Sequence, residues 1–153
     1  MSGPDGSEPG AGHEQVASDG PAATEALGAA LAARLRPGDV VLLRGDLGAG
    51  KTTLVRGAAR ALGAAAPVTS PTFALAHRYD ADGVRVAHLD LYRLAGLGEE
   101  DEELLEDELD GPVIAFVEWP GPVAALVEPR VRVEVDLRHE GGDRRRIDLR
   151  WRS

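Results

Sequence analysis

A glycine-rich segment constrains this chain more than any other feature. Residues 45–52 read GDLGAGKT and match the phosphate-binding pattern G-x-x-x-x-G-K-[ST] at every fixed position. Its glycines allow the backbone angles and the close approach that a loop around phosphate groups requires. Lys51 would bridge the β- and γ-phosphates, and the Thr52 hydroxyl would bind Mg²⁺. The segment therefore predicts a nucleoside triphosphate site.

The flanking sequence supports this site. Residues 39–44 are typical of a buried strand leading into the loop, and residues 53–62 of the helix that follows it. The N-terminus of such a helix directs N–H groups and a positive dipole end at the phosphates. Lys51 is the only lysine, and every other fixed positive charge is an arginine. At this position lysine supplies a compact point charge on a flexible stem, which differs chemically from the planar guanidinium of arginine.

Length and composition bound the remaining possibilities. A chain of 153 residues is expected to form one domain with a real core. It has no cysteine, no apolar run of membrane-spanning length and no signal-peptide pattern, so we expect a cytoplasmic protein outside any membrane. The net charge of −9 argues against the chain gripping DNA or RNA by itself.

The chain divides into a polar tail and a folded domain. Residues 1–20 are rich in Gly, Ser, Pro, Asp and Glu, and we expect them to be disordered. Residues 21–153 are expected to form the P-loop domain. It opens with an amphipathic helix whose apolar residues recur at helical spacing, and Pro37-Gly38 ends that helix.

The later segments predict a mixed sheet. Residues 73–79 and 84–89 read as one antiparallel hairpin, and residues 131–137 and 146–151 as another at the sheet edge. Residues 112–120 contain the most apolar strand, which fits a central position covered on both faces. The predicted fold class is α/β: a P-loop NTPase-like single domain with a mixed sheet flanked by helices.

Polar residues at the ends of these strands are candidates for the chemistry. Asp90 ends an apolar strand, where a magnesium-associated carboxylate is expected, although Asp also ends strands as a turn former. Glu118 could hold Mg²⁺ through water or orient the attacking water. Ser70 and Thr72 allow two interpretations. They are either ordinary loop hydroxyls or part of a loop that senses the γ-phosphate. Trp119 is an aromatic residue suited to a partner contact.

Two charged segments favour plainer interpretations. Residues 98–110 are strongly acidic, with Leu104, Leu105 and Leu109 on one helix face, which indicates a solvated helix rather than a docking surface for a basic partner. The arginines at 144–146 favour edge protection and solubility over a role near nucleotide or RNA.

Four motifs taken together resemble a known family. They are GDLGAGKTT at 45–53, SPTF at 70–73, HLDLYRL at 88–94 and VEWP at 117–120. In this order they resemble the signature of the TsaE (YjeE) ATPases, bacterial proteins required for threonylcarbamoyladenosine formation in tRNA. The blocks span most of the chain after the tail, and only the polar N-terminal extension departs from the family pattern.

The resemblance implies a P-loop α/β fold and an ATPase of low intrinsic rate. It also implies ATP and Mg²⁺ as cofactors, and TsaB and TsaD as partners through whose complex tRNA is mainly contacted. By the same resemblance Thr52 and Glu118 bind Mg²⁺ and Asp90 belongs to a motif resembling Walker B. Thr72 lies in a switch-like loop, and Trp119 belongs to a Glu-Trp pair. The nucleotide-binding residues it implies are Thr24, Gly45, Asp46, Leu47, Gly48, Ala49, Gly50, Lys51, Thr52 and Thr53.

Two other functions use the same loop. A small-molecule kinase is the main alternative, although the chain shows no arginine-rich lid. A guanine-nucleotide switch is a third option. The chain contains no asparagine, so the usual Asn-Lys-x-Asp guanine-reading motif is absent. The preferred prediction is an ATPase in which water attacks the γ-phosphate in line.

Overall fold

The computed structural model describes residues 12–45, 50–64, 68–69, 76–91, 99–118 and 124–152. Over these residues the chain forms an eight-stranded mixed sheet in the order β1-β8-β7-β2-β6-β5-β4-β3. The strands are β1 (Gly12–Ser18), β2 (Val40–Gly45), β3 (Val68–Thr69), β4 (Ala76–Ala81), β5 (Val84–Asp90), β6 (Val113–Glu118), β7 (Val131–His139) and β8 (Arg145–Trp151). The helices are α1 (Pro21–Ala32), α2 (Lys51–Ala61), α3 (Glu99–Glu108), α4 (Ala124–Val127) and the short 3₁₀ helix η3 (Glu128–Arg130).

The centre of the sheet is parallel and its flanks are antiparallel. Strand β2 pairs in parallel with β6 on one side and with β7 on the other, and β5 pairs in parallel with β6. Both predicted hairpins are present, as β4–β5 and β7–β8. The α/β, P-loop-type fold class predicted from the sequence is confirmed.

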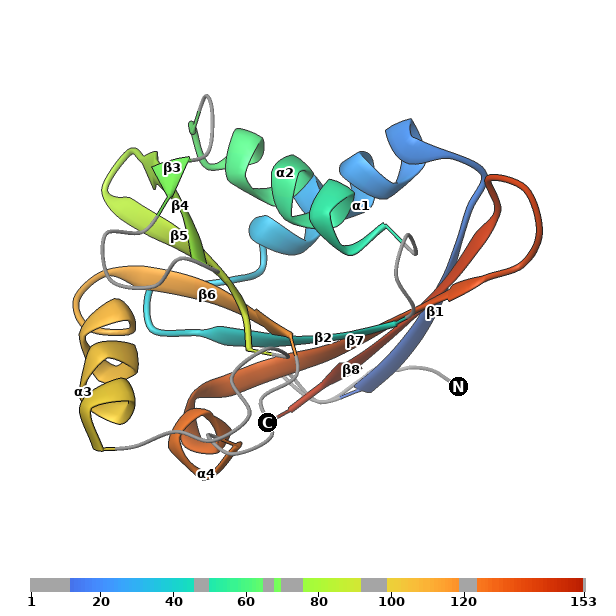
Figure 1. Ribbon diagram of the computed structural model, residues 1–153. Helices are drawn as coiled ribbons and strands as arrows, with labels where there is room; N and C mark the ends of the chain where they lie inside the picture. Colours follow the sequence, from blue (N-terminus) through green and yellow to red (C-terminus); the bar gives the residue numbers. More distant parts are fainter. Residues whose placement is uncertain are drawn as a thin grey trace.

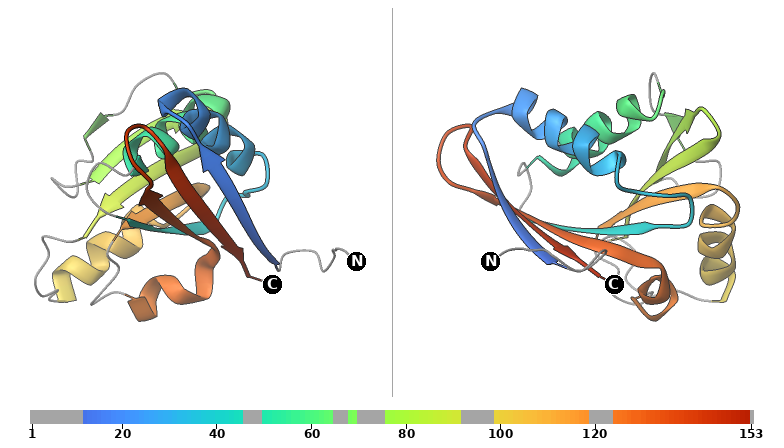
Figure 2. Two further views of the ribbon diagram at one scale, coloured as in Figure 1. Left: turned by 90° about the vertical axis from the view of Figure 1, so that its right-hand side faces the viewer. Right: turned by 180° about the vertical axis from the view of Figure 1, so that it is seen from behind.

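Helices cover both faces of the sheet. Helices α1 and α2 lie together on one face, and α3 and α4 lie on the other (Figures 1 and 2). The first four residues of β2 are all apolar because both faces of the strand are covered: Val41 and Leu43 join the core under α1 and α2, whereas Val40 and Leu42 join the opposite core. None of the described helices is long and apolar enough to cross a membrane.

The acidic segment forms α3, as the helical spacing of its leucines indicated. Leu105 and Leu109 are buried in the second core, while the side chains of Glu102, Glu103, Glu106 and Asp107 are exposed. The arrangement is that of a solvated helix with an apolar stripe.

Two glycines bring α1 and α2 into backbone contact. A Cβ atom added at Gly28 would lie 2.1 Å from the carbonyl oxygen of Leu54, and one added at Gly57 would lie 2.1 Å from that of Glu25. Only glycine fits such an approach. The contact holds the N-terminal turn of α2 beside that of α1.

The predicted extent of the disordered tail is wrong at its C-terminal end. Residues 12–18 form β1, which pairs antiparallel with β8 from Gly12 opposite Trp151 to Ser18 opposite Arg145. The prediction counted apolar side chains, but β1 is stabilised chiefly by backbone hydrogen bonds to β8, with only Ser18 fully buried and Val16 partly so. Residues 1–11 lie outside the described residues.

Candidate functional site

The glycine-rich segment lies between the end of β2 and the start of α2. Gly45 has φ of 146°, and a Cβ there would lie 2.5 Å from the carbonyl oxygen of Leu137 on β7. Gly50 has φ of 100° and caps α2 in the left-handed conformation. Both positions require glycine, which explains two fixed positions of the motif. Asp46, Leu47, Gly48 and Ala49 lie outside the described residues.

Lys51 is the first residue of α2, and its side chain turns back toward the strand ends. The ammonium donates a hydrogen bond to the Gly45 carbonyl oxygen at 2.7 Å and pairs with Glu118 Oε1 at 3.0 Å. The side chains of Lys51 and Glu118 are each only 8% exposed. The only lysine of the chain therefore joins the two ends of the segment to the tip of β6.

A buried carboxylate and a histidine meet at the ends of β5 and β6, and a second carboxylate ends β5 beside them. Asp90 is the register partner of Glu118, so both side chains start from the same face of the sheet. His88, two residues before Asp90, shares that face, and its Nε2 lies 2.5 Å from Glu118 Oε2. His88 is buried as well. The predicted residues Lys51 and Glu118 are thus in contact, His88 is added to them, and the predicted Asp90 lies opposite Glu118 on the neighbouring strand.

The electrostatics keep Glu118 ionised. Burial acts to raise its pKa, but the hydrogen bonds and charges of His88 and Lys51 outweigh burial and lower the pKa below its ordinary value. An ionised carboxylate at this position can hold a cation or orient a water molecule.

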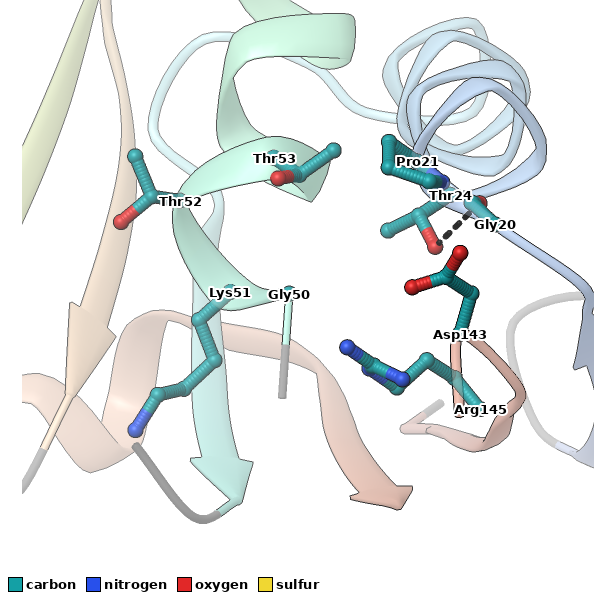
Figure 3. A pocket seen from close by; sticks show the side chains of 9 residues that line it. All are labelled: Gly20, Pro21, Thr24, Gly50, Lys51, Thr52, Thr53, Asp143 and Arg145. Carbon is teal, nitrogen blue, oxygen red and sulfur yellow. Dashed lines mark hydrogen bonds between the residues drawn. The ribbon is translucent and has the colours of Figure 1, made fainter. Parts of the chain in front are cut away.

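A cavity of about 200 Å³ opens beside the first turn of α2 (Figure 3). Its lining consists of Gly20, Pro21, Thr24, Gly50, Lys51, Thr52, Thr53, Asp143 and Arg145. Thr24 is buried at its edge, where its Oγ1 lies 2.7 Å from Ser18 Oγ and donates to the Gly20 carbonyl oxygen at 3.3 Å. The predicted residues Thr24, Gly50, Lys51, Thr52 and Thr53 therefore line one space. The predicted Ser70, Thr72 and Trp119 lie outside the described residues.

The donor set fits magnesium in the way that nucleotide sites hold it. Among the described residues no three His, Asp or Glu side chains form a cluster able to enclose a metal ion. Mg²⁺ at nucleotide sites needs only one or two protein oxygens, because phosphates and waters supply the others. Asp90 and Glu118 at the strand ends and the exposed Thr52 at the start of α2 suit that requirement.

Sequence reasoning left three residues of this region out of the candidate site. His88 could have been found from its period-two spacing to Asp90, since a polar residue in an apolar strand must face something polar. Asp143 lies in a turn far along the chain and Arg145 follows that turn, and no local pattern connects them with residues 45–52.

Comparison with known proteins identifies the family. Residues 18–147 match the family model described as "Threonylcarbamoyl adenosine biosynthesis protein TsaE". The chain belongs to the TsaE family. It is 49% identical over 113 residues to the tRNA threonylcarbamoyladenosine biosynthesis protein TsaE of Streptomyces coelicolor, covering 72% of this chain and 76% of that protein. It is 38% identical over 131 residues to the protein of the same name in Bacillus subtilis, covering 83% and 78%.

The fold of a solved TsaE relative agrees with this assignment. The crystal structure of Bacillus subtilis YdiB superimposes with a TM-score of 0.68 at 31% identity, covering 94% of this chain and 88% of the other. The resemblance to the TsaE family seen in the four sequence motifs is therefore confirmed. The P-loop-type fold and TsaE membership support a nucleotide-binding function.

Proposed function

We propose that this TsaE-family chain is a magnesium-dependent ATPase of low intrinsic rate that serves threonylcarbamoyladenosine formation in tRNA. The observation that carries the proposal is the buried contact of Lys51, the first residue of α2, with Glu118, beside which Asp90 lies on the neighbouring strand. Lys51 supplies a cation for the phosphates, and Glu118 and Asp90 supply carboxylates for the metal. These groups lie near the start of α2, a helix capped by a glycine. Family membership supports the role in tRNA modification.

Each side chain has a defined task in this proposal. Lys51 exchanges its contact with Glu118 for the β- and γ-phosphates. Thr52, Glu118 and Asp90 would hold Mg²⁺, directly or through water, and the ion would supply charge neutralisation at the phosphates. Glu118 also orients the attacking water, and Thr72 senses the γ-phosphate. No covalent intermediate on the protein is needed, because positioning and charge neutralisation supply the catalysis.

The wider assembly is part of the proposal. We infer that the chain acts on a complex of TsaB and TsaD, with Trp119 at the contact, and that ATP binding or hydrolysis resets that complex. The net charge of −9 favours contact with tRNA mainly through the partners. Mixing the purified chain with TsaB and TsaD, with and without ATP, tests whether association and turnover depend on each other.

The site is tested by two substitutions, at Lys51 and Glu118, and by a control on the helix that carries Lys51. Lys51→Ala should abolish ATP binding in calorimetry, and Glu118→Ala should weaken magnesium use and lower hydrolysis by about a hundredfold, a typical loss for a transition-state contact. Arg60→Ala removes an exposed cation at the far end of α2 that pairs with Glu25, and should change neither. Undiminished turnover in both site variants would overturn the assignment. Formation of a phosphorylated metabolite in place of inorganic phosphate would point to a kinase.

A further inference from the structure

The proposed mechanism gives no task to His88, although this residue is buried at the site. It interrupts the apolar part of β5, where Val86, Ala87 and Leu89 are fully buried. A polar ring withdrawn from water costs free energy unless its nitrogens are paired. An aliphatic side chain would satisfy packing at this position, so the histidine indicates a polar task.

The two oxygens of the Glu118 carboxylate have different partners. Oε2 lies 2.5 Å from Nε2 of His88, and Oε1 lies 3.0 Å from Nζ of Lys51. A carboxylate oxygen accepts hydrogen bonds, so Nε2 is the ring nitrogen that carries a proton and donates it.

These two contacts fix the plane of the carboxylate. The last torsion of a glutamate side chain has broad, roughly two-fold preferences, so rotamer preferences alone leave the plane loosely defined. A donor on each oxygen defines it, because rotation of the plane would lengthen the hydrogen bonds. The orientation of Glu118 therefore depends on His88 and Lys51 together.

The two partners differ in how freely they can leave. His88 belongs to β5, an interior strand that pairs with both β4 and β6, and it lies opposite Phe116 beside Glu118. Lys51 carries its ammonium on a flexible four-carbon stem at the first turn of α2. Lys51 can therefore move to the phosphates while His88 stays in place.

We propose that His88 is a positioning residue that keeps Glu118 in one orientation before and after a nucleotide binds. Nε2 of His88 holds Oε2 throughout, and departure of Lys51 frees only Oε1. Glu118 then acts on the metal ion and the attacking water through one oxygen rather than both. This inference rests on the proposed function, because the departure of Lys51 and the task of Glu118 come from it.

Two substitutions separate the donor from the volume of the ring. His88→Gln retains an N–H donor at a similar reach, whereas His88→Leu retains a similar volume and removes the donor. Single-turnover hydrolysis of ATP with Mg²⁺ and calorimetric binding of ATP are measured on the full chain. His88→Leu should hydrolyse ATP about tenfold more slowly, a loss typical of residues that orient a metal ligand. Its affinity for ATP should stay close to that of the unaltered chain, and His88→Gln should recover most of the rate.

His77→Leu is the matched control. His77 is the register partner of His88 on β4, and its side chain is exposed. The substitution removes the same kind of ring from the neighbouring strand, and it should change neither the rate nor the affinity. Urea denaturation of the three variants shows whether each of them folds.

A spectroscopic measurement tests the contact without turnover. In the full chain labelled with ¹⁵N-histidine, NMR should show a proton on Nε2 of His88. The His88→Gln spectrum assigns this signal among those of the four histidines. The signal should persist when a non-hydrolysable ATP analogue and Mg²⁺ are added, because His88 keeps Oε2 after Lys51 leaves.

The inference is overturned by an unchanged rate in His88→Leu, by a rate in His88→Gln as low as that in His88→Leu, or by loss of the Nε2 proton signal when the analogue binds. If a variant fails to fold, the NMR measurement on the unaltered chain decides. A failure of the proposed function looks different, since the unaltered chain then neither binds nor hydrolyses ATP, while the Nε2 signal of the nucleotide-free chain is still present.

Discussion

Among single residues, the buried contact between Lys51 and Glu118 matters both for the proposed function and for the stability of the fold. Two charges that are almost withdrawn from water are tolerated only while each has partners. His88 supplies the second partner of Glu118. These three side chains form a connected polar group at the strand ends, and removal of one member leaves the others unbalanced.

We expect Glu118→Gln to lower the free energy of unfolding by about 3 kcal/mol in the absence of nucleotide, because it leaves Lys51 buried beside a neutral amide. Urea denaturation at neutral pH measures this change. A variant as stable as the unaltered chain without nucleotide would contradict the ion pair.

The same carboxylate predicts a pH dependence. The pKa of Glu118 in the folded chain lies below its usual 4.5. The unfolded chain therefore binds more protons in this range, so the contribution of Glu118 to stability is present above about pH 4.5 and is lost as the pH falls through the folded-state pKa. The difference in unfolding free energy between the unaltered chain and Glu118→Gln should shrink over that interval.

At the scale of elements, the packing of α1 on α2 decides where the phosphate site lies. The helices touch backbone to backbone at Gly28 and Gly57, which places Thr24 of α1 beside Gly50 at the start of α2. A shift of one helix would therefore move one wall of the cavity.

Gly28→Ala separates two opposing effects. Helix propensity alone predicts a gain of about 1 kcal/mol from replacing a helical glycine by alanine. The new Cβ would lie 2.1 Å from the Leu54 carbonyl oxygen, so the helices must move apart, at a typical cost of about 1–3 kcal/mol. We expect the steric cost to outweigh the gain in helix propensity, so that the variant has a lower melting temperature and binds ATP more weakly. Ala26→Ser, on the exposed side of α1, should leave ATP binding unchanged.

The elements also show what local sequence can and cannot predict. Period-two spacing was sufficient for β7 and β8, because each buries alternate side chains. Helical spacing placed α1, but the helix ends at Ala32 rather than at Pro37-Gly38, and it buries Thr24 and Gly28 beside Leu31. Strand β1 has almost no apolar face, and its pairing depends on an edge of β8 that lies at the other end of the chain. Lys51, Asp90 and Glu118 belong to local motifs, whereas Asp143 and Arg145 reach the cavity only through the order of strands in the sheet.

At the scale of the whole molecule, β1 covers the outer edge of the sheet and joins both cavity walls. Deleting residues 1–17 should expose the edge of β8 and remove the support of Arg145. We expect a melting temperature lower by about 5 °C or more, which corresponds to roughly 1.5 kcal/mol in a domain of this size, together with self-association in light scattering. Deleting only residues 1–11 retains β1 and serves as the control. Equal melting of the two truncated chains would contradict a stabilising role for β1.

The pairing of Gly12 with Trp151 has a practical consequence. Adjacent strands of a sheet run about 5 Å apart, so a short peptide could connect Arg152 directly to Gly12 and turn β8 and β1 into one hairpin. A circularly permuted chain could then begin at the exposed turn around Asp82, on the opposite flank of the sheet, without cutting any strand that lines the cavity.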